Sequence, residues 1–300
     1  MKSEMRRNTL STTSDETVHK PSYIWLWSLI FLLIISHYRL SAMKRPFPAA
    51  SGVKIHAPIE WKDNGIRKIR VSTYNIHHAK GEDGVTDISR TASLLIKDDI
   101  VGLQEVSAPT LFWGDDQAAQ LAEILETGWL FSPSQERYYQ TSTGNSLLSR
   151  LPIQAWHSQP LAWMDDLEGS ARSRRYRNMI VADLMLGGKT VKLFVTHLDR
   201  GQIRHSQLKS VLQQFDLYDS AILMADLNTY PNDTVLKAWL TENPEADAIA
   251  VAMNEHRAHS WGEELRLDWI LIRGFRVLNG GFEPIGISDH PYLWVELELL

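Results

Sequence analysis

The sequence predicts an α/β fold in which two packed sheets are covered by helices. From Arg67 to the C-terminus, short apolar runs of strand length mix with amphipathic stretches of helix length, without strict alternation. Strict alternation would indicate one parallel sheet, whereas this mixed order favours two sheets packed face to face. The length of 300 residues and the apolar fraction of 44% are sufficient for a sizeable core. Cysteine is absent, which excludes disulfide scaffolds, thiol catalysis and cysteine-ligated metal sites.

Hydrophobic spacing and capping residues predict the elements of the first half of this region. Asp87 is suited to be the N-cap of a helix, because its carboxylate can accept hydrogen bonds from free backbone N–H groups. A second helix is expected to turn Leu121, Ile124 and Leu125 towards the core. In chain order we expect a strand over 67–76, the helix after Asp87, a strand over 99–105, a helix over 117–126 and several strands within 129–162.

The second half is expected to be richer in strands. Gly187 and Gly188 stand between two apolar runs, and adjacent glycines are typical of a tight hairpin turn. Asp233 precedes an apolar run as a helix N-cap would. In chain order we expect hairpin strands over 178–186 and 190–197, a helix over 202–216, a strand over 221–225, a helix from Asp233 to Leu240, and strands over 267–272, 275–282 and 292–299.

An apolar run near the N-terminus predicts a membrane anchor. Residues 23–35 read YIWLWSLIFLLII, and an extension to Leu40 approaches the length of a membrane span. We expect an uncleaved signal anchor that makes this a single-pass membrane protein, with its body outside the cytoplasm. A cleaved signal peptide and a buried or interfacial helix remain alternatives. The expected division is a polar tail (1–22), an anchor helix (23–40), a linker (41–66) and a folded domain (67–300).

Charge is distributed unevenly along the chain. The first 59 residues carry a formal net charge of +5 and the remainder −10, within a total of −5. An acidic body attracts a polyphosphate chain poorly, although a local basic patch can suffice. The densest basic cluster contains Arg172, Arg174, Arg175 and Arg177, and is typical either of a solvated loop or of a contact with an anion or a membrane surface.

Polar and ionisable residues follow six of the predicted apolar runs. A buried carboxylate without a partner costs several kcal/mol, so repeated carboxylates at strand ends suggest convergence on a cation. The oxygen-rich set favours Mg²⁺ or Mn²⁺, and the histidines lack zinc-type spacing. Metal, carboxylates and imidazoles together are typical of phosphate ester hydrolysis by an activated water. The runs end at Tyr74-Asn75, Leu103-Gln104-Glu105, Val195-Thr196-His197, Met224 to Asn228, Leu267-Asp268 and Ile287 to His290.

These segments resemble those of the endonuclease/exonuclease/phosphatase superfamily, which includes deoxyribonuclease-like nucleases, inositol-phosphate phosphatases and neutral sphingomyelinases. The resemblance runs from about Ile69 to the C-terminus, in the family's order. It implies a four-layer α-β-β-α sandwich of two packed mixed sheets flanked by helices. One departure is Ala225, where the family more often has glycine. The matching segments are TYNIHH, VGLQEV, GNSLLSRLPI, FVTHLD with the following RHSQL, MADLN, LDWIL and ISDHP.

The resemblance also implies roles for individual residues. Asn75, Glu105 and Asp289 would be the metal-binding set, with Glu105 the principal ligand. His290 would be the general base, oriented by Asp268. The implied roles of the others are a hydrogen bond to the scissile phosphate from His197, positioning of the water by Asp226, and a hydrogen bond to a phosphate oxygen from Asn228.

The expected function is therefore that of a membrane-tethered, Mg²⁺-dependent (or Mn²⁺-dependent) phosphoesterase. We expect it to hydrolyse a phosphodiester, either a lipid head group or another small phosphoester. One alternative is a DNA or RNA nuclease with the same site, and another is a non-catalytic, membrane-bound interaction module. His77 and His78, which follow the first motif, are expected to belong to a solvated loop.

Overall fold

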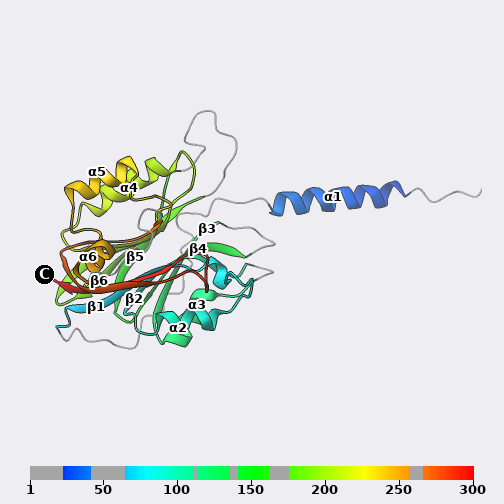
Figure 1. Cartoon of the computed structure of the whole chain (residues 1–300). Helices are drawn as coiled ribbons and strands as arrows, with labels where there is room; N and C mark the ends of the chain where they lie inside the picture. Colours follow the sequence, from blue (N-terminus) through cyan, green and yellow to red (C-terminus); the bar gives the residue numbers. More distant parts are fainter. Residues whose placement is uncertain (1–22, 42–64, 111–113, 136–140, 163–175, 257–265) are drawn as a thin grey trace, which may run out of the picture. The chain divides into compact units, whose positions relative to one another are not determined.

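The computed structural model describes residues 23–41, 65–110, 114–135, 141–162, 176–256 and 266–300. The chain divides into two units, Met1–Leu40 and Ser41–Leu300. The first contains most of one helix, α1 (Ile24–Ser41), and the second contains all the strands (Figure 1). Each unit is described by itself.

Helix α1 corrects the expectation of a membrane anchor. Among the described residues, no helix is both long enough and apolar enough to cross a membrane, and this includes α1. The physical reason lies in its last turns, because the apolar run ends at Ile35 and is followed by Ser36, His37 and Arg39. A spanning helix needs roughly 20 predominantly apolar residues. The expectation of a single-pass membrane protein is wrong, and the expected position of its body outside the cytoplasm loses the anchor on which it depended.

The first sheet of the folded unit has six strands. Its centre is the parallel pair β1 and β2, and every other neighbouring pair is antiparallel. This mixture of directions agrees with the expected mixed sheet. The strand order is β10 (Phe275–Glu283), β11 (Tyr292–Leu299), β1 (Lys68–Asn75), β2 (Ile100–Ala108), β4 (Ser142–Ser149) and β3 (Gly128–Gln135).

The second sheet has five strands and is also mixed. Strands β7 and β8 are parallel, and the other pairs are antiparallel. The β6–β7 hairpin turns at Gly187 and Gly188, which have φ of 55° and 76°. Glycine suits this turn because it adopts positive φ without steric cost. The strand order is β5 (Ile153–Pro160), β6 (Asn178–Leu186), β7 (Lys189–His197), β8 (Ala221–Asp226) and β9 (Asp268–Arg273).

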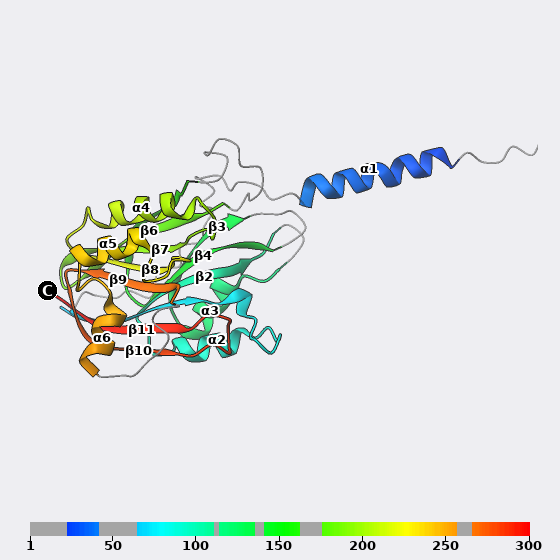
Figure 2. The same cartoon turned by 45° about the horizontal axis from the view of Figure 1, so that its top comes forward.

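Helices cover the outer faces of the two sheets, which gives the expected four-layer sandwich (Figures 1 and 2). Helices α2 (Ile88–Leu95) and α3 (Gln117–Leu125) pack on the first sheet, and α4 (Arg204–Phe215) and α5 (Thr234–Glu242) on the second. The largest apolar cluster lies between the sheets, where strands of both contribute alternate residues. This arrangement confirms the fold that the sequence predicts.

Local signals explain most helix starts, and two features differ from expectation. As expected, Asp87 and Asp233 cap α2 and α5, because their carboxylates accept hydrogen bonds from backbone N–H groups of the first turn. Ile124 is 49% exposed, because α3 rests on the sheet through Leu121 and Leu125 instead. Helix α6 (Ala248–His256) is additional to the expected elements. It packs against β9, β10 and β11, so tertiary contacts of its apolar side chains fix its position.

Asp98 is a buried carboxylate whose hydrogen bonds connect strands of the first sheet. It accepts hydrogen bonds from Ser72 Oγ (2.7 Å), Arg70 Nε (3.0 Å) and the Tyr292 hydroxyl (2.8 Å). These donors come from β1 and β11, so one carboxylate joins two strands to the turn before β2. Burial raises the pKa of Asp98 to about 6, and the hydrogen bonds oppose that rise. The ionised form therefore depends on its donors.

We predict that Tyr292→Phe lowers the free energy of unfolding by about 1.5–3 kcal/mol at pH 7, the typical effect of a hydrogen bond to a charged group. Removal of a donor raises the pKa of folded Asp98 further, so the folded state binds the proton more tightly than the unfolded state does. A raised pKa in the folded state means that protonated Asp98 contributes to the free energy of unfolding. This contribution is complete below the pKa of about 3.9 that the carboxyl has in the unfolded chain, and it is lost as the pH rises through the pKa of the folded state. The decrease in the free energy of unfolding that Tyr292→Phe causes should therefore be smaller at pH 5 than at pH 7.

Urea denaturation of both proteins at pH 7 and pH 5 measures this difference. Tyr230→Phe, at an exposed tyrosine, is the control and should change stability little at either pH. An equal loss for Tyr292→Phe at the two pH values would contradict the role given to Asp98.

Candidate active site

Strand register brings three ionisable side chains into line at one end of the second sheet. In the parallel pair β7 and β8, His197 lies opposite Asp226. In the antiparallel pair β8 and β9, Asp226 lies opposite Asp268. The three residues therefore occupy neighbouring positions on three adjacent strands, and His197 Nε2 is 3.1 Å from Asp226 Oδ2. All three are buried.

The first sheet contributes Asn75, at the end of β1. Its Nδ2 donates a hydrogen bond to Asp226 Oδ2 at 2.9 Å, which joins the two sheets directly. Ser288 Oγ donates to the backbone carbonyl of Asn75 at 2.7 Å. That bond holds the segment carrying Asp289 and His290 against the end of β1. The site thus forms where both sheets and one connecting segment meet.

His290 and Asp268 form a buried pair next to Asp226. His290 Nδ1 is 2.8 Å from Asp268 Oδ2, and His290 Nε2 is 3.8 Å from Asp226 Oδ2. A carboxylate on one ring nitrogen fixes the tautomer, so that the other nitrogen can exchange a proton. The second carboxylate oxygen of Asp268 is buried and accepts no hydrogen bond from a described residue, so the imidazole, together with the charge of Arg266, compensates its charge.

Burial and mutual charge set the proton affinities of these groups. Burial lowers the pKa of His290, but the hydrogen bond and charge of Asp268 and the charge of Asp226 outweigh it and raise that pKa to about 9. Burial, reinforced by the charge of Asp268, raises the pKa of Asp226 to about 7. Burial also raises the pKa of Asp268. Asp226 therefore takes up or releases a proton near neutral pH, and His290 beside it holds its proton until the pH is well above neutral.

Asn228 follows β8 and is held from several directions. Its backbone N–H donates to Asp226 Oδ1 (2.9 Å), and its Nδ2 donates to the Leu198 carbonyl (2.8 Å). The same Nδ2 lies 3.0 Å from His197 Nε2. Arg200 Nε donates to Asn228 Oδ1 at 3.1 Å, so the oxygen is engaged and the amide nitrogen faces His197. The side chain is therefore oriented as a hydrogen-bond donor.

Glu105 enters the site from a β-bulge in β2. The register of β2 with β4 shifts between Leu103 and Val106, and Glu105 has a φ of 54°. Its carboxylate oxygens lie 3.9 Å from His197 Nδ1 and 4.0 Å from His78 Nε2. Among the described residues, no donor makes a hydrogen bond to this carboxylate. A partly buried carboxylate with free lone pairs fits a hard divalent cation.

Asp289 is more exposed than the other acids, with 48% of its side chain accessible, and its Oδ1 lies 3.6 Å from His77 Nδ1. Asn75, Glu105 and Asp289 offer oxygen donors only, which is the ligand chemistry of Mg²⁺ or Mn²⁺. The group of Asp, Glu and His side chains that does have ligand spacing in the described part of the chain is Asp226, Asp268 and His290, whose donor atoms lie within 4.8 Å of one another. There Asp268 engages the imidazole, which suits proton transfer.

Backbone strain concentrates at this site. Six non-glycine residues in the described part of the chain have positive φ, and one of them, Glu126, is the C-cap of α3. Left-handed backbone costs a non-glycine residue about 1 kcal/mol or more and persists where surrounding contacts impose it. Such residues cluster at functional sites. The other five are His77, His78, Ala79, Glu105 and Asn228.

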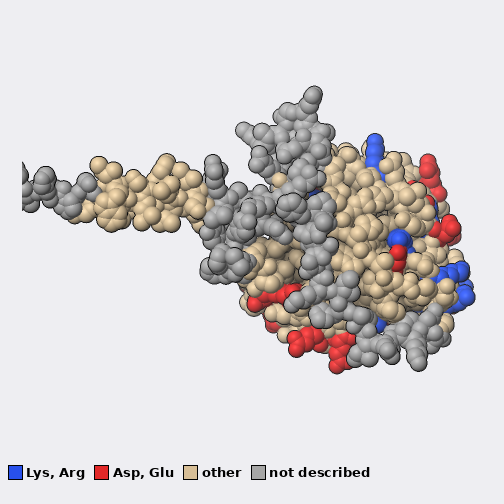
Figure 3. Space-filling model, turned by 180° about the vertical axis from the view of Figure 1, so that it is seen from behind, with Lys and Arg blue, Asp and Glu red and all other residues tan. Residues whose placement is uncertain are grey.

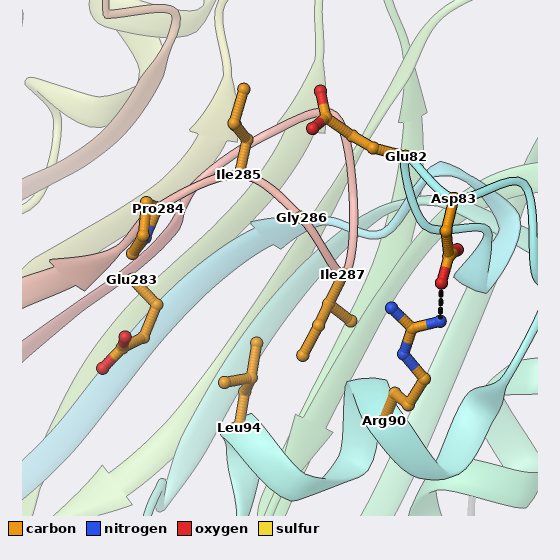
Figure 4. Close-up of a pocket in the computed structure, with 9 residues that line it drawn as sticks. All are labelled: Glu82, Asp83, Arg90, Leu94, Glu283, Pro284, Ile285, Gly286 and Ile287. Carbon is orange, nitrogen blue, oxygen red and sulfur yellow. Dashed lines mark hydrogen bonds and ion pairs between the residues drawn. The ribbon is translucent and has the colours of Figure 1, made fainter.

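A cavity of about 500 Å³ lies beside the segment that leads to Asp289, between residues 82–83, helix α2 and residues 283–287 (Figure 4). Asp83 forms an ion pair with Arg90 at 2.8 Å at one side of it, and the Glu82 N–H donates to the Gly286 carbonyl at 3.0 Å. None of the sequence-predicted site residues lines this cavity. It is therefore separate from the cluster around Asp226.

The sequence interpretation missed three residues at the site. His77 and His78, expected in a solvated loop, face Asp289 and Glu105, and Arg200 contacts Asn228. The left-handed turn that directs the histidines has no signal in residue type, whereas Arg200 stands close to the THLD segment. In the basic cluster, Arg177 is buried, and Arg172, Arg174 and Arg175 lie outside the described residues.

Solved structures of known proteins share this fold. An endonuclease/exonuclease/phosphatase from Beutenbergia cavernae is 25% identical, with a TM-score of 0.62 over 78% of this chain and 72% of that chain. A mannosyl-6-phosphatase from Bacteroides thetaiotaomicron is 18% identical, with a TM-score of 0.57 over 76% of this chain and 99% of that chain. The human Nocturnin catalytic domain is 16% identical, with a TM-score of 0.58 over 83% of this chain and 98% of that chain. No curated protein matches the sequence.

The family assignment follows from the sequence itself. The model of the Endonuclease/Exonuclease/phosphatase family matches residues 72–290, a span that contains every site residue discussed above. Members of this family are phosphoester hydrolases and typically act with a divalent metal ion. By this match, and in agreement with its fold, the chain belongs to the endonuclease/exonuclease/phosphatase family.

Proposed function

We propose that this protein hydrolyses a small phosphoester with the help of Mg²⁺ or Mn²⁺. The observation that carries the proposal is the position of Asp226. One buried carboxylate accepts a hydrogen bond from Asn75 of the opposite sheet and lies within 4 Å of the imidazoles of His197 and His290. Acid, base and amide donors thus surround one point, as metal-assisted attack of water on a phosphoester requires.

His290 is the proposed general base. Asp268 holds its Nδ1, which leaves Nε2 directed towards Asp226 and able to accept a water proton when the imidazole is in its neutral form. Asp226 orients that water and stabilises the imidazolium that forms when the proton is taken up. Asp268 compensates the same positive charge from the other side of the ring, and does so without itself taking the proton.

His197 and Asn228 are the proposed donors to the phosphoryl oxygens. Asn228 presents an amide nitrogen because Arg200 engages its oxygen. Amide donors stabilise negative charge on the transferring group without adding charge of their own. Both side chains are buried, so they are held in place before the substrate binds.

Asn75, Glu105 and Asp289 are the residues that would hold the divalent cation. When bound there, the cation polarises a phosphoryl oxygen and neutralises charge on the leaving group. Glu105 is the principal ligand in this proposal, because no hydrogen bond from a described residue engages its carboxylate.

Charge favours a small phosphoester over a long nucleic acid. The chain after residue 59 carries a net charge of −10. Of the basic side chains near the site, Arg204 is committed to the Asn228 carbonyl and Asp233. On the face in Figure 3, described Lys and Arg side chains stand as separate spots with acidic groups between them. A groove that follows a polyanion should have a basic stripe instead.

We predict that Glu105→Gln lowers the Mg²⁺-dependent hydrolysis rate at least about 100-fold, because loss of the principal ligand forfeits several kcal/mol of transition-state stabilisation. Steady-state rates against Mg²⁺ concentration measure the effect, and circular dichroism checks the fold. Glu126→Gln is a matched control, since Glu126 has nearly the same φ but caps α3. Turnover in Glu105→Gln within a few-fold of the parent would contradict the metal assignment.

We predict that His290→Ala lowers kcat by roughly 10²–10⁴-fold, the usual contribution of a general base. Asp268→Asn should also lower kcat strongly, because an amide neither fixes the tautomer nor compensates the imidazolium. Mg²⁺ affinity, measured by calorimetry, should change little in either variant. His157→Ala, at an exposed histidine of β5, is the control. A large loss of Mg²⁺ affinity in His290→Ala would mean that His290 is a ligand.

A substrate panel tests the proposed substrate class. The full chain with Mg²⁺ should hydrolyse sugar phosphates, inositol phosphates or short-chain phospholipid head groups faster than DNA or RNA. Rates are compared at matched concentrations by release of phosphate or head group, with Glu105→Gln as the blank. Preferential cleavage of single- or double-stranded nucleic acid, with a steep decline as salt rises, would favour the nuclease alternative.

A further inference from the structure

Arg200 is an exposed arginine whose side chain contacts the proposed active site. It follows the THLD segment, in the connection between β7 and α4. Its Nε donates a hydrogen bond to Asn228 Oδ1 at 3.1 Å, and its backbone N–H donates to Asp199 Oδ1 at 2.7 Å. Because a long side chain has many rotamers, the bond from Nε is what keeps the guanidinium beside Asn228.

The positive charge of Arg200 has no anionic partner in the described part of the chain. The group that its Nε contacts is a neutral amide, and no described residue accepts a hydrogen bond from its two terminal nitrogens. Two other arginines of the folded unit, Arg204 and Arg266, form ion pairs with aspartates instead. The terminal nitrogens of a guanidinium form a planar fork that matches a carboxylate or a phosphate. Arg200 therefore presents a fixed site for an anion.

Asn228 places this charge next to the proposed donors to the phosphoryl group. Its amide oxygen faces Arg200, whereas its amide nitrogen lies 3.0 Å from His197 Nε2. The guanidinium therefore lies on a different side of the amide from His197. A phosphoryl group that binds between His197 and Asn228 leaves Arg200 to contact a neighbouring part of the same substrate.

We propose that Arg200 binds a second anionic group, a carboxylate or a phosphate, that the substrate carries close to its scissile phosphate. This inference rests on the proposed function and names its substrate class, which is small phosphoesters with two anionic groups. A charged, two-pronged contact from a guanidinium is stronger than a hydrogen bond between neutral groups. The second anionic group therefore increases affinity, and Arg200 determines this specificity.

The test compares two small phosphoesters that differ in one charged group. Glycerol 3-phosphate and 3-phosphoglycerate share a three-carbon body and a phosphate, but the second compound has a carboxylate where the first has a hydroxymethyl group. Calorimetry with the full chain in EDTA measures both affinities without turnover. The parent should bind 3-phosphoglycerate about tenfold more tightly, the effect of a hydrogen bond to a charged group. Arg200→Gln should remove most of that preference, and Arg276→Gln, at an exposed arginine of β10, should leave it unchanged.

Two outcomes would overturn the inference. One is that the parent binds the two compounds equally, or does not measurably bind 3-phosphoglycerate, a result that needs no variant. The other is that Arg200→Gln, shown to be folded by circular dichroism, weakens the binding of both compounds equally, which would limit Arg200 to positioning Asn228. Rates with Mg²⁺ separate this inference from the proposed function. If no phosphoester of the substrate panel is hydrolysed, the proposed function fails, whereas the affinity ratio still decides the role of Arg200.

Discussion

The site depends on satisfying one fully buried carboxylate, that of Asp226. A carboxylate out of contact with water is tolerated only where donors surround it. Here the Asn75 amide, the backbone N–H of Asn228 and two imidazoles surround it. Because Asn75 belongs to the other sheet, the bond that satisfies Asp226 also sets how the two sheets meet at this end. Packing and chemistry are therefore not separable at this position.

Backbone strain at the site is a second unfavourable energy term that the rest of the fold must offset. Five of the six left-handed non-glycine residues described here lie at the site, and none of them is needed to close a hairpin. The contacts that impose this backbone come from distant parts of the chain, such as Gln117 on α3 holding the turn at His78. Glu105 protrudes because a bulge interrupts its strand. The side chains are thus aimed before any ligand is present.

Chemistry and substrate choice rest on different parts of the molecule. The reacting groups stand at strand ends within a sheet framework common to the family, and family membership by itself does not choose a substrate. The lipid preference expected from the sequence depended partly on a membrane anchor that α1 is too short and too polar to be. What remains is the net charge of −10 on the chain after residue 59, which disfavours a long polyanion as the substrate.

The sequence by itself determined the strands, the capped helices and the residue types at the strand ends, because periodicity and capping are local properties of the chain. It also determined family membership, since the ordered motifs are local as well. Only the tertiary structure decided that His197, Asp226 and Asp268 stand side by side, because that follows from strand register. The same holds for the left-handed turn at His77 and His78, for the packing of α6, and for the outward position of Ile124. Each of these is set by contacts between residues far apart in the chain, which no local pattern contains.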